Sequence, residues 1–188
     1  MKKIGITGSL ASGKTTASKI LSGRKGPLFS ADLIVKNLYR NQNFKKRLAK
    51  KLNINNIKNL KNILKKKLVR NRHLVNKLEK IIHPLVRKEM SKFSKKNKKK
   101  KMIFFEIPLL IESNLMKNFD VIFFIKAKKS VRLKRFKSKG GNEKLFKILD
   151  KKQLSAHKKI VFCDHIIVNE KNIKILKKKL LYILKKYE

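Results

Sequence analysis

Cysteine is nearly absent from this chain of 188 residues, and tryptophan is absent altogether. The single cysteine, Cys163, excludes an internal disulfide and a zinc cluster built from cysteines. No apolar run approaches the roughly 20 residues that a membrane-spanning helix needs, so we expect no membrane partner. The first residues, Met1-Lys2-Lys3, lead straight into an apolar segment and do not resemble a signal peptide. Together these absences predict a cytoplasmic protein in a reducing compartment.

Acidic residues are scarce as well. The chain has 11 Asp and Glu against 53 Lys and Arg, which gives a formal net charge of +42 at pH 7. Such a charge attracts nucleic acid or an anionic membrane. However, 45 of the basic residues are Lys and 8 are Arg, and they are spread along the whole chain. Because A/T-rich codons encode Lys, Asn and Ile, we interpret the charge as codon bias and expect no specific nucleic-acid partner.

The hydrophobic content of 41% and the length predict one folded domain with room for an inserted subdomain. Apolar segments alternate with helical patterns, which predicts an α/β fold with a parallel sheet. The expected strands are 2–7, 27–30, 102–107, 121–126 and 165–168, and the expected helices are 15–21, 31–39, 130–137, 142–158 and 171–187.

The interval 43–101 breaks this alternation. It contains several helical patterns and no convincing strand, and Leu74, Leu78, Ile81 and Ile82 mark one apolar face. We interpret it as a helical insertion that covers the substrate side of the sheet. Its end, residues 95–101, is almost pure lysine and predicts a solvated loop.

The eight residues after the first expected strand carry the clearest chemical signal. Gly8-Ser9-Leu10-Ala11-Ser12-Gly13-Lys14-Thr15 fits the pattern G-x-x-x-x-G-K-[ST], and a helical pattern follows from Thr16. Two glycines let the backbone wrap closely around phosphate oxygens, and the loop amides form an anion nest. Lys14 can reach the β- and γ-phosphates, and the Thr15 hydroxyl can ligate Mg²⁺. The motif therefore predicts that the chain binds a nucleoside triphosphate.

Asp32 follows the second expected strand, at the carboxyl end where open α/β sheets build their sites. Its carboxylate could accept a proton from a hydroxyl that attacks the γ-phosphate. A helix N-cap is an equally good interpretation, because Asp is preferred at that position. In the helical insertion, Arg87 could hold an anionic substrate group through paired hydrogen bonds. His83 could donate to the substrate, although a lone His near an apolar face is more often simply packed.

Two further segments could contribute to a site. Glu106 and Glu112 flank Pro108-Leu109-Leu110, and either carboxylate could touch metal-bound water or a substrate hydroxyl, whereas the leucines could equally be core. A basic cluster follows the fourth expected strand and precedes a glycine pair at 140–141; it consists of Arg132, Lys134, Arg135, Lys137 and Lys139. The pair and the charges predict a mobile lid over the triphosphate, with a solvated face as the alternative.

These segments, taken together, resemble the dephospho-coenzyme A kinase family. The matching pieces follow the family's order and cover nearly the whole chain: Ile6 to Thr16, Ser30-Ala31-Asp32, Leu78-Glu79 with His83-Pro84 and Arg87, Pro108-Leu109-Leu110 with Glu112, residues 132–135, Gln153, and Cys163-Asp164 with Asn169. The phosphate loop is shared by many families. The His-Pro-x-x-Arg and Pro-Leu-Leu-x-Glu elements are much more specific to this one.

The resemblance implies phosphorylation of the ribose 3′-hydroxyl of dephospho-CoA by MgATP. It implies a P-loop NTPase three-layer fold with a five-stranded parallel sheet: a nucleotide-binding core at 1–42 and 102–188, a lid at about 136–150 within it, and a helical CoA-binding insertion at 43–101. By this analogy Asp32 is the catalytic base and Lys14 acts on the phosphates. The ATP site takes in Gly8, Ser9, Leu10, Ala11, Ser12, Gly13, Lys14, Thr15 and Thr16, and Thr15 also holds Mg²⁺. The substrate site takes in Asp32, His83, Arg87, Pro108, Leu109 and Leu110, and the lid carries Arg135 and Lys139.

The chain departs from the family pattern at two charged positions. Ser30 stands where the family usually has Asp, and Lys139 stands where the family's lid often has Arg, so a charge and a two-pronged hydrogen-bond donor are lost. Two other functions stay open from the sequence: another small-molecule or nucleotide kinase on the same fold, and a basic RNA-binding protein with an inactive phosphate loop. Lysine in place of arginine and the lack of interleaved aromatics weigh against the RNA-binding protein. We expect a monomer, although the sequence does not determine the oligomeric state.

Overall fold

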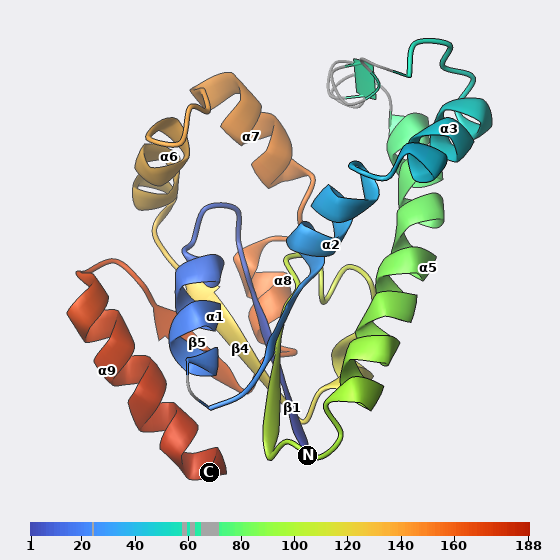
Figure 1. Ribbon diagram of the computed structural model, residues 1–188. Coiled ribbons are helices and arrows are strands. Elements are labelled where there is room, and N and C mark those ends of the chain that lie inside the picture. The colour runs from blue at the N-terminus through green and yellow to red at the C-terminus, as the bar shows by residue number, and fades with distance from the viewer. Residues whose placement is uncertain (24, 58–59, 61–62, 65–71) are drawn as a thin grey trace. The chain divides into compact units, whose positions relative to one another are not determined.

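The computed structural model describes residues 1–23, 25–57, 60, 63–64 and 72–188. These residues form two compact units, one made of Met1–Ser30 and Asn97–Glu188 and the other of Ala31–Lys96. The first unit contains the sheet and the second is helical (Figure 1). Residues 58–59, 61–62 and 65–71 of the predicted insertion lie outside the described residues.

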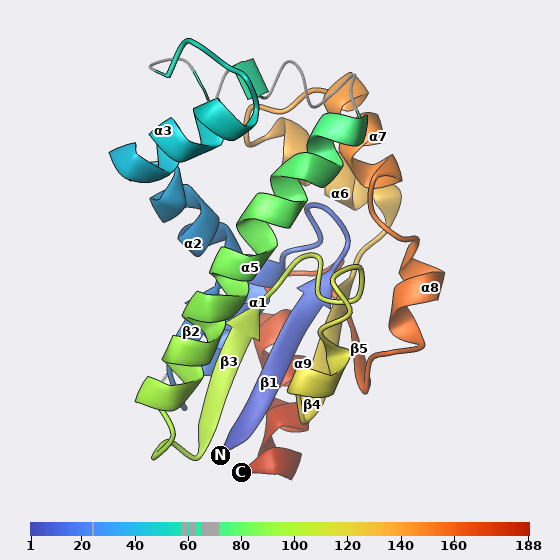
Figure 2. The same ribbon diagram turned by 90° about the vertical axis from the view of Figure 1, so that its right-hand side faces the viewer.

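Five parallel strands form the sheet of the first unit, in the order β2-β3-β1-β4-β5 (Figure 2). They are β1 (Lys2–Gly8), β2 (Leu28–Ser30), β3 (Met102–Glu106), β4 (Val121–Lys126) and β5 (His165–Val168). Each strand matches its expected segment to within one residue at either end. The predicted α/β fold with a parallel sheet is therefore confirmed.

One face of this sheet is covered by α1 (Lys14–Ser22) and α9 (Ile173–Leu184), which lie side by side (Figure 1). Successive side chains of a strand point to opposite faces, so alternate residues of β1 and β4 meet these helices. The resulting core contains Ile4, Ile6, Val121, Phe123 and Ile125 from the strands and Ala17, Leu21, Leu176, Leu180 and Leu184 from the helices. The apolar stripe expected in the last helix is thus part of the core.

On the opposite face, the segment after β3 packs directly on β1. Gly5 makes this close approach possible, because a Cβ atom there would lie 2.9 Å from Leu110 Cδ1 and 3.1 Å from Phe119 Cγ. The Phe119 ring packs edge-on against Phe105, with ring centroids 5.3 Å apart. A short 3-10 helix, η1 (Met116–Asn118), leads from this segment toward β4.

The single helix expected over 142–158 is wrong. The structure has α6 (Lys129–Lys137), then α7 (Glu143–Lys151) and a separate α8 (Ala156–Ile160). Leu154 N–H leaves the helical pattern to donate to Glu112 Oε1 at 3.1 Å, and Ser155 begins α8 by accepting from Lys158 N–H. A contact with a distant carboxylate therefore accompanies the break, and the local signal for the new helix is Ser155, a preferred N-cap residue.

The second unit is built from α2 (Ala31–Leu38), α3 (Gln42–Lys51) and α5 (Arg72–Lys96). Asn41 caps α3, since its side chain accepts from Phe44 N–H at 3.0 Å. The core of this unit consists of Phe44, Leu48, Ala49, Ile54, Leu60, Leu64, Leu78 and Ile82, with Leu74 and Ile81 packed against it. The predicted apolar face is therefore confirmed. The loop expected at 95–101 begins later, because Lys95 and Lys96 are still in α5.

Candidate nucleotide-binding site

The predicted phosphate loop joins β1, the central strand of the sheet, to α1. Parallel strands all end at the same edge, so the loop lies at the carboxyl edge where this class of sheet binds ligands. The helix begins at Lys14, with Gly13 as its N-cap. The N–H groups of the first helical turn, which have no acceptor within a helix, therefore face the loop, and this favours an anion there.

The backbone of the loop has the alternating conformation of an anion nest. The angle φ is 151° at Gly8, 58° at Ala11 and 97° at Gly13. A Cβ atom on Gly8 would lie 2.4 Å from the Ile125 carbonyl oxygen, and one on Gly13 would lie 2.2 Å from Asn169 Nδ2. Both positions therefore disfavour a side chain, since each combines a positive φ with a close contact, whereas Ala11 tolerates the left-handed region at a cost of about 1–2 kcal/mol.

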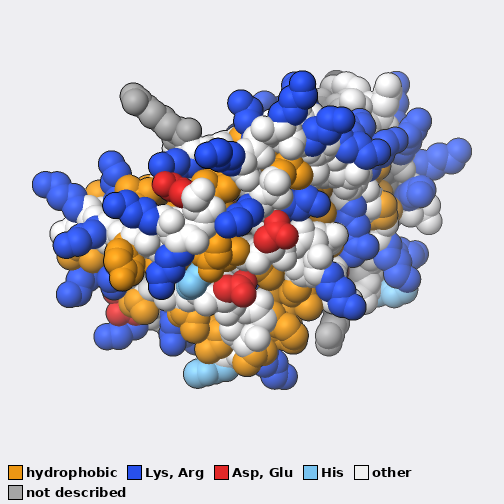
Figure 3. Space-filling view, turned by 90° about the horizontal axis from the view of Figure 1, so that it is seen from below, with side chains coloured by type: hydrophobic (Ala, Val, Ile, Leu, Met, Phe, Trp, Pro, Cys, Tyr) orange, Lys and Arg blue, Asp and Glu red, His pale blue; other side chains and the backbone are white. Residues whose placement is uncertain are grey.

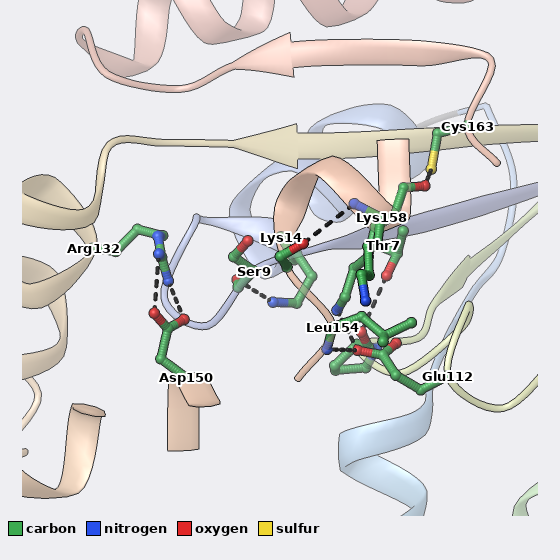
Figure 4. Close-up of polar contacts among 12 residues, drawn as sticks. Thr7, Ser9, Lys14, Glu112, Arg132, Asp150, Leu154, Lys158 and Cys163 are labelled. Carbon is green, nitrogen blue, oxygen red and sulfur yellow. Dashed lines mark hydrogen bonds and ion pairs between the residues drawn. The ribbon is translucent and has the colours of Figure 1, made fainter. Parts of the chain in front are cut away.

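Lys14 is 8% exposed, and its Nζ donates to the Ser9 carbonyl oxygen at 2.8 Å. The ammonium group is therefore held across the mouth of the loop (Figure 4). A phosphate oxygen is a stronger acceptor than a neutral carbonyl oxygen. A bound phosphate can therefore replace the Ser9 carbonyl as the partner of the Lys14 ammonium group.

Thr15 follows on the exposed side of α1, and its hydroxyl donates to Glu106 Oε1 at 2.5 Å. Glu106 is 2% exposed and ends β3, the strand next to β1. The hydroxyl uses its proton in this bond and keeps its lone pairs for another partner. A hydroxyl and a carboxylate oxygen side by side are hard donors of the kind that Mg²⁺ prefers.

Side chains from two other elements hold the outside of the loop. Arg132 of α6 donates to the Leu10 carbonyl oxygen at 3.2 Å, and it forms a two-pronged ion pair with Asp150 of α7 at 2.6 and 3.3 Å (Figure 4). Arg135 donates to the Ser12 carbonyl oxygen at 3.3 Å. The predicted basic cluster therefore divides: two arginines contact the loop, whereas Lys139 is exposed.

The Pro108–Leu110 segment lies next to the same strand. Thr7 Oγ1 donates to the Pro108 carbonyl oxygen at 3.1 Å, and Leu110 is fully buried on the sheet. Glu112, the second carboxylate considered above, forms an ion pair at 2.6 Å with Lys159, whose side chain is fully buried. This pair fastens α8 to the segment after β3, which gives Glu112 a structural partner.

Three predicted site residues belong to the second unit. Asp32 is in the first turn of α2 and is exposed. His83 and Arg87 are four residues apart on α5 and share one face of that helix, with His83 half-buried and Arg87 exposed. Helices α2 and α5 pack against each other within the unit.

Sequence reasoning gave no role to two residues that contact or support the loop. Asn169, which is 6% exposed, donates from Nδ2 to the Ser12 carbonyl oxygen at 2.9 Å. Asp150 holds Arg132 in place. The position of Asn169 just after the last expected strand was the available signal, because parallel strands end at a common edge.

A phosphate loop at the head of the central strand of a five-stranded parallel sheet places this chain in the class of P-loop NTPase folds. The dephospho-CoA kinase family model matches residues 2–174. The chain belongs to the dephospho-CoA kinase family.

Individual relatives agree over the full length. The chain is 30% identical to a dephospho-CoA kinase of Bartonella henselae, covering 98% of this chain and 97% of the relative. It is 33% identical to a dephospho-CoA kinase of Fusobacterium nucleatum, covering 94% and 93%. Its fold is similar to the crystal structure of TT1252 from Thermus thermophilus, with a TM-score of 0.81, 21% identity and coverage of 98% and 97%. Among the described residues, no helix combines the length and the apolar character needed to cross a bilayer.

Proposed function

We propose that this chain transfers the γ-phosphoryl group of ATP to the ribose 3′-hydroxyl of dephospho-CoA, producing coenzyme A and ADP. Membership of the dephospho-CoA kinase family over residues 2–174 carries this proposal. The phosphate loop supports it independently, because its glycines, its lysine and its threonine stand where a triphosphate needs them.

In the proposed reaction the ribose 3′-oxygen attacks the γ-phosphorus, and the bond from that phosphorus to the β–γ bridging oxygen breaks. The proton of the hydroxyl passes to the Asp32 carboxylate, and the electron pair of the broken bond stays on ADP. The loop amides and Lys14 bind the β- and γ-phosphate oxygens and stabilise the charge that develops there. On the lid side, Arg135 adds positive charge, and Lys139 is proposed to do the same.

Mg²⁺ is the metal we propose for this site. The donor set fits, because the Thr15 hydroxyl keeps its lone pairs while it donates to Glu106, so Thr15 would hold the metal with the Glu106 carboxylate beside it as a second hard oxygen donor. The remaining ligands would be phosphate oxygens and water, as Mg²⁺ keeps several waters when it binds with a nucleotide. When bound, the metal neutralises charge on the phosphates.

The second unit supplies the proposed acceptor site. Asp32 is the proposed base, and His83 and Arg87 are proposed to bind the anionic CoA portion, supported by their shared face on α5. Leu109 and Pro108 are proposed to line the same substrate site. Residues 43–101 are the proposed CoA-binding insertion, and residues from about 136 to 150 are the proposed lid. We also propose that the protein is a cytoplasmic monomer and that it has no specific nucleic-acid partner.

The direct test is a coupled ATP assay with dephospho-CoA, followed by mass analysis of the product. We expect a product one phosphoryl group heavier than dephospho-CoA, and no turnover by Lys14→Ala, which also controls for contaminating kinases. Phosphorylation of a nucleoside monophosphate and not of dephospho-CoA would instead support another P-loop kinase. No ATP turnover with either substrate, together with structure-selective RNA binding, would support an RNA-binding protein.

A further inference from the structure

The carbonyl groups of the phosphate loop are held from outside by side-chain donors. The Ser12 carbonyl oxygen accepts from Asn169 Nδ2 at 2.9 Å and from Arg135 at 3.3 Å, and the Leu10 carbonyl oxygen accepts from Arg132 at 3.2 Å. Asn169 lies 157 residues from Ser12 in the sequence. We propose that Asn169 is a positioning residue for nucleotide binding, which fixes the Ser12–Gly13 peptide so that its N–H group points into the phosphate cradle.

The geometry of the Ser12–Gly13 peptide fixes the direction of the Gly13 N–H group. A trans peptide is planar, so the C=O of one residue and the N–H of the next point in opposite directions. No peptide bond among the described residues is cis. When Asn169 holds the Ser12 C=O on the outer side of the loop, the Gly13 N–H must point to the inner side, where phosphate oxygens bind.

Asn169 is itself fixed to the sheet. It follows β5 directly, and its backbone N–H donates to the Lys126 carbonyl oxygen at the end of β4, at 2.8 Å. Its side chain is buried and packs so closely on Gly13 that a Cβ atom there would lie 2.2 Å away. Asn169 thus ties the loop to the carboxyl ends of β4 and β5. Arg135 holds the same carbonyl with a longer bond and belongs to the proposed lid, so it cannot supply a fixed reference.

The consequence for binding is preorganisation. The Ser12–Gly13 peptide can rotate about ψ of Ser12 and the permissive φ of Gly13 unless a donor holds its carbonyl group. A held peptide presents its N–H to phosphate without an ordering cost at the moment of binding. We therefore expect Asn169 to affect ligands that bind in the phosphate loop, such as ADP, and to leave the dephospho-CoA site unchanged. This inference rests on the proposed function only in taking the nucleotide as the ligand.

The test compares Asn169→Ala with Asn172→Ala in the full chain. Asn172 is three residues further on and caps α9, because its side chain accepts from Ile175 N–H at 3.0 Å. Binding of MgADP and of inorganic pyrophosphate is measured by calorimetry, and the melting temperature is measured alongside. We expect Asn169→Ala to weaken MgADP binding about tenfold or more, a change that corresponds to about 1.4 kcal/mol. Asn172→Ala should lower the melting temperature and keep MgADP binding within about twofold.

A second variant, Asn169→Asp, keeps the side-chain volume and removes the donor, with Asn172→Asp as its control because Asp caps helices as well as Asn. We expect weaker MgADP binding and a higher KM for ATP in Asn169→Asp, with the KM for dephospho-CoA unchanged. MgADP binding by both Asn169 variants within twofold of the parent chain would overturn the positioning role. Failure of the parent chain to phosphorylate dephospho-CoA would overturn the proposed function alone, because MgADP binding is measured without the acceptor.

Discussion

At the scale of single residues, the chemistry of this protein depends on side chains that are buried or bonded in unusual ways. Lys14 is a charged residue that is 8% exposed and bonded to the backbone of its own loop. The loop sequence alone predicts this residue, because the helix that follows begins at a fixed distance from the first glycine. Lys14 can act on a nucleotide because its ammonium group can exchange the neutral Ser9 carbonyl oxygen for a phosphate oxygen.

Asp32→Asn tests the proposed base. The amide keeps the size of the side chain but cannot take the proton of the ribose hydroxyl, so kcat should fall by about 10²–10⁴-fold with the KM for ATP unchanged. Steady-state kinetics with ATP and dephospho-CoA measure this. Asp120→Asn is the matched control, since the Asp120 carboxylate accepts from Lys3 N–H near the start of β1, away from the phosphate loop, and the kcat of this variant should match the parent. An Asp32→Asn enzyme with parental kcat removes this residue from proton transfer.

Cys163 should be nearly inert in the folded chain. Burial raises the pKa of its thiol from 9.0 to about 12. The thiolate is the reactive form, so at about pH 8 iodoacetamide should alkylate the folded chain about a thousandfold more slowly than the urea-unfolded chain. Mass spectrometry of timed samples measures both rates. Rates within tenfold of each other would show that the thiol is not protected by the fold.

At the scale of elements, the end of the chain is fastened to the sheet by a small polar cluster. A hydrogen bond of 2.5 Å joins His165 Nε2 of β5 to the Tyr187 hydroxyl. Lys2 Nζ donates to the Tyr187 carbonyl oxygen at 3.0 Å. Tyr187 is in η2 (Lys185–Tyr187), so the two termini lie close together in the first unit (Figure 2).

This cluster makes a pH-dependent contribution to stability. Burial is the main cause that lowers the pKa of His165 from 6.5, so the fold favours the neutral ring. As the pH falls below about 6.5, the unfolded chain binds a proton that the folded chain resists, and the free energy of unfolding decreases until the lower folded pKa is passed. Urea denaturation at a series of pH values should show a smaller acid loss for His165→Gln than for the control His157→Gln, which changes an exposed histidine. An equal acid loss in both variants would contradict this prediction.

Elements also show where sequence reasoning stops. The strands were predictable because buried parallel strands are short, apolar and bounded by turns, as Val121–Lys126 is. The break between α7 and α8 was not predicted, because the contacts that Leu154 N–H and Lys159 make with Glu112, 42 residues from Leu154, are tertiary. The propensities within 142–158 favour one helix, and the N-cap residue Ser155 was the one local signal against it.

At the scale of the whole molecule, charge dominates. Lys and Arg side chains are spread over the face drawn in Figure 3, with apolar side chains between them. With 11 acidic residues against 53 basic ones, ion pairs cannot balance the positive charge, and a net charge of +42 remains. Like charges this dense repel one another and destabilise the compact state.

Salt should therefore stabilise this protein. Raising NaCl from about 20 mM to about 500 mM shortens the screening length severalfold and weakens the repulsion, so the melting temperature should rise. Differential scanning calorimetry measures the change. The same salt should release nonspecifically bound RNA. A melting temperature that stays constant or falls would show that the charges do not limit stability.

The sequence by itself determined the phosphate loop and the five strands, because these depend on local backbone requirements and on short hydrophobic periods. Its motifs, taken in order, indicated the family by resemblance. Only the tertiary structure decided which side chains surround the loop. Thr15 meets Glu106 across 91 residues and Ser12 meets Asn169 across 157, since parallel strands gather their ends at one edge whatever their distance along the chain. Strand order and register set those partners, and neither can be read from a local pattern.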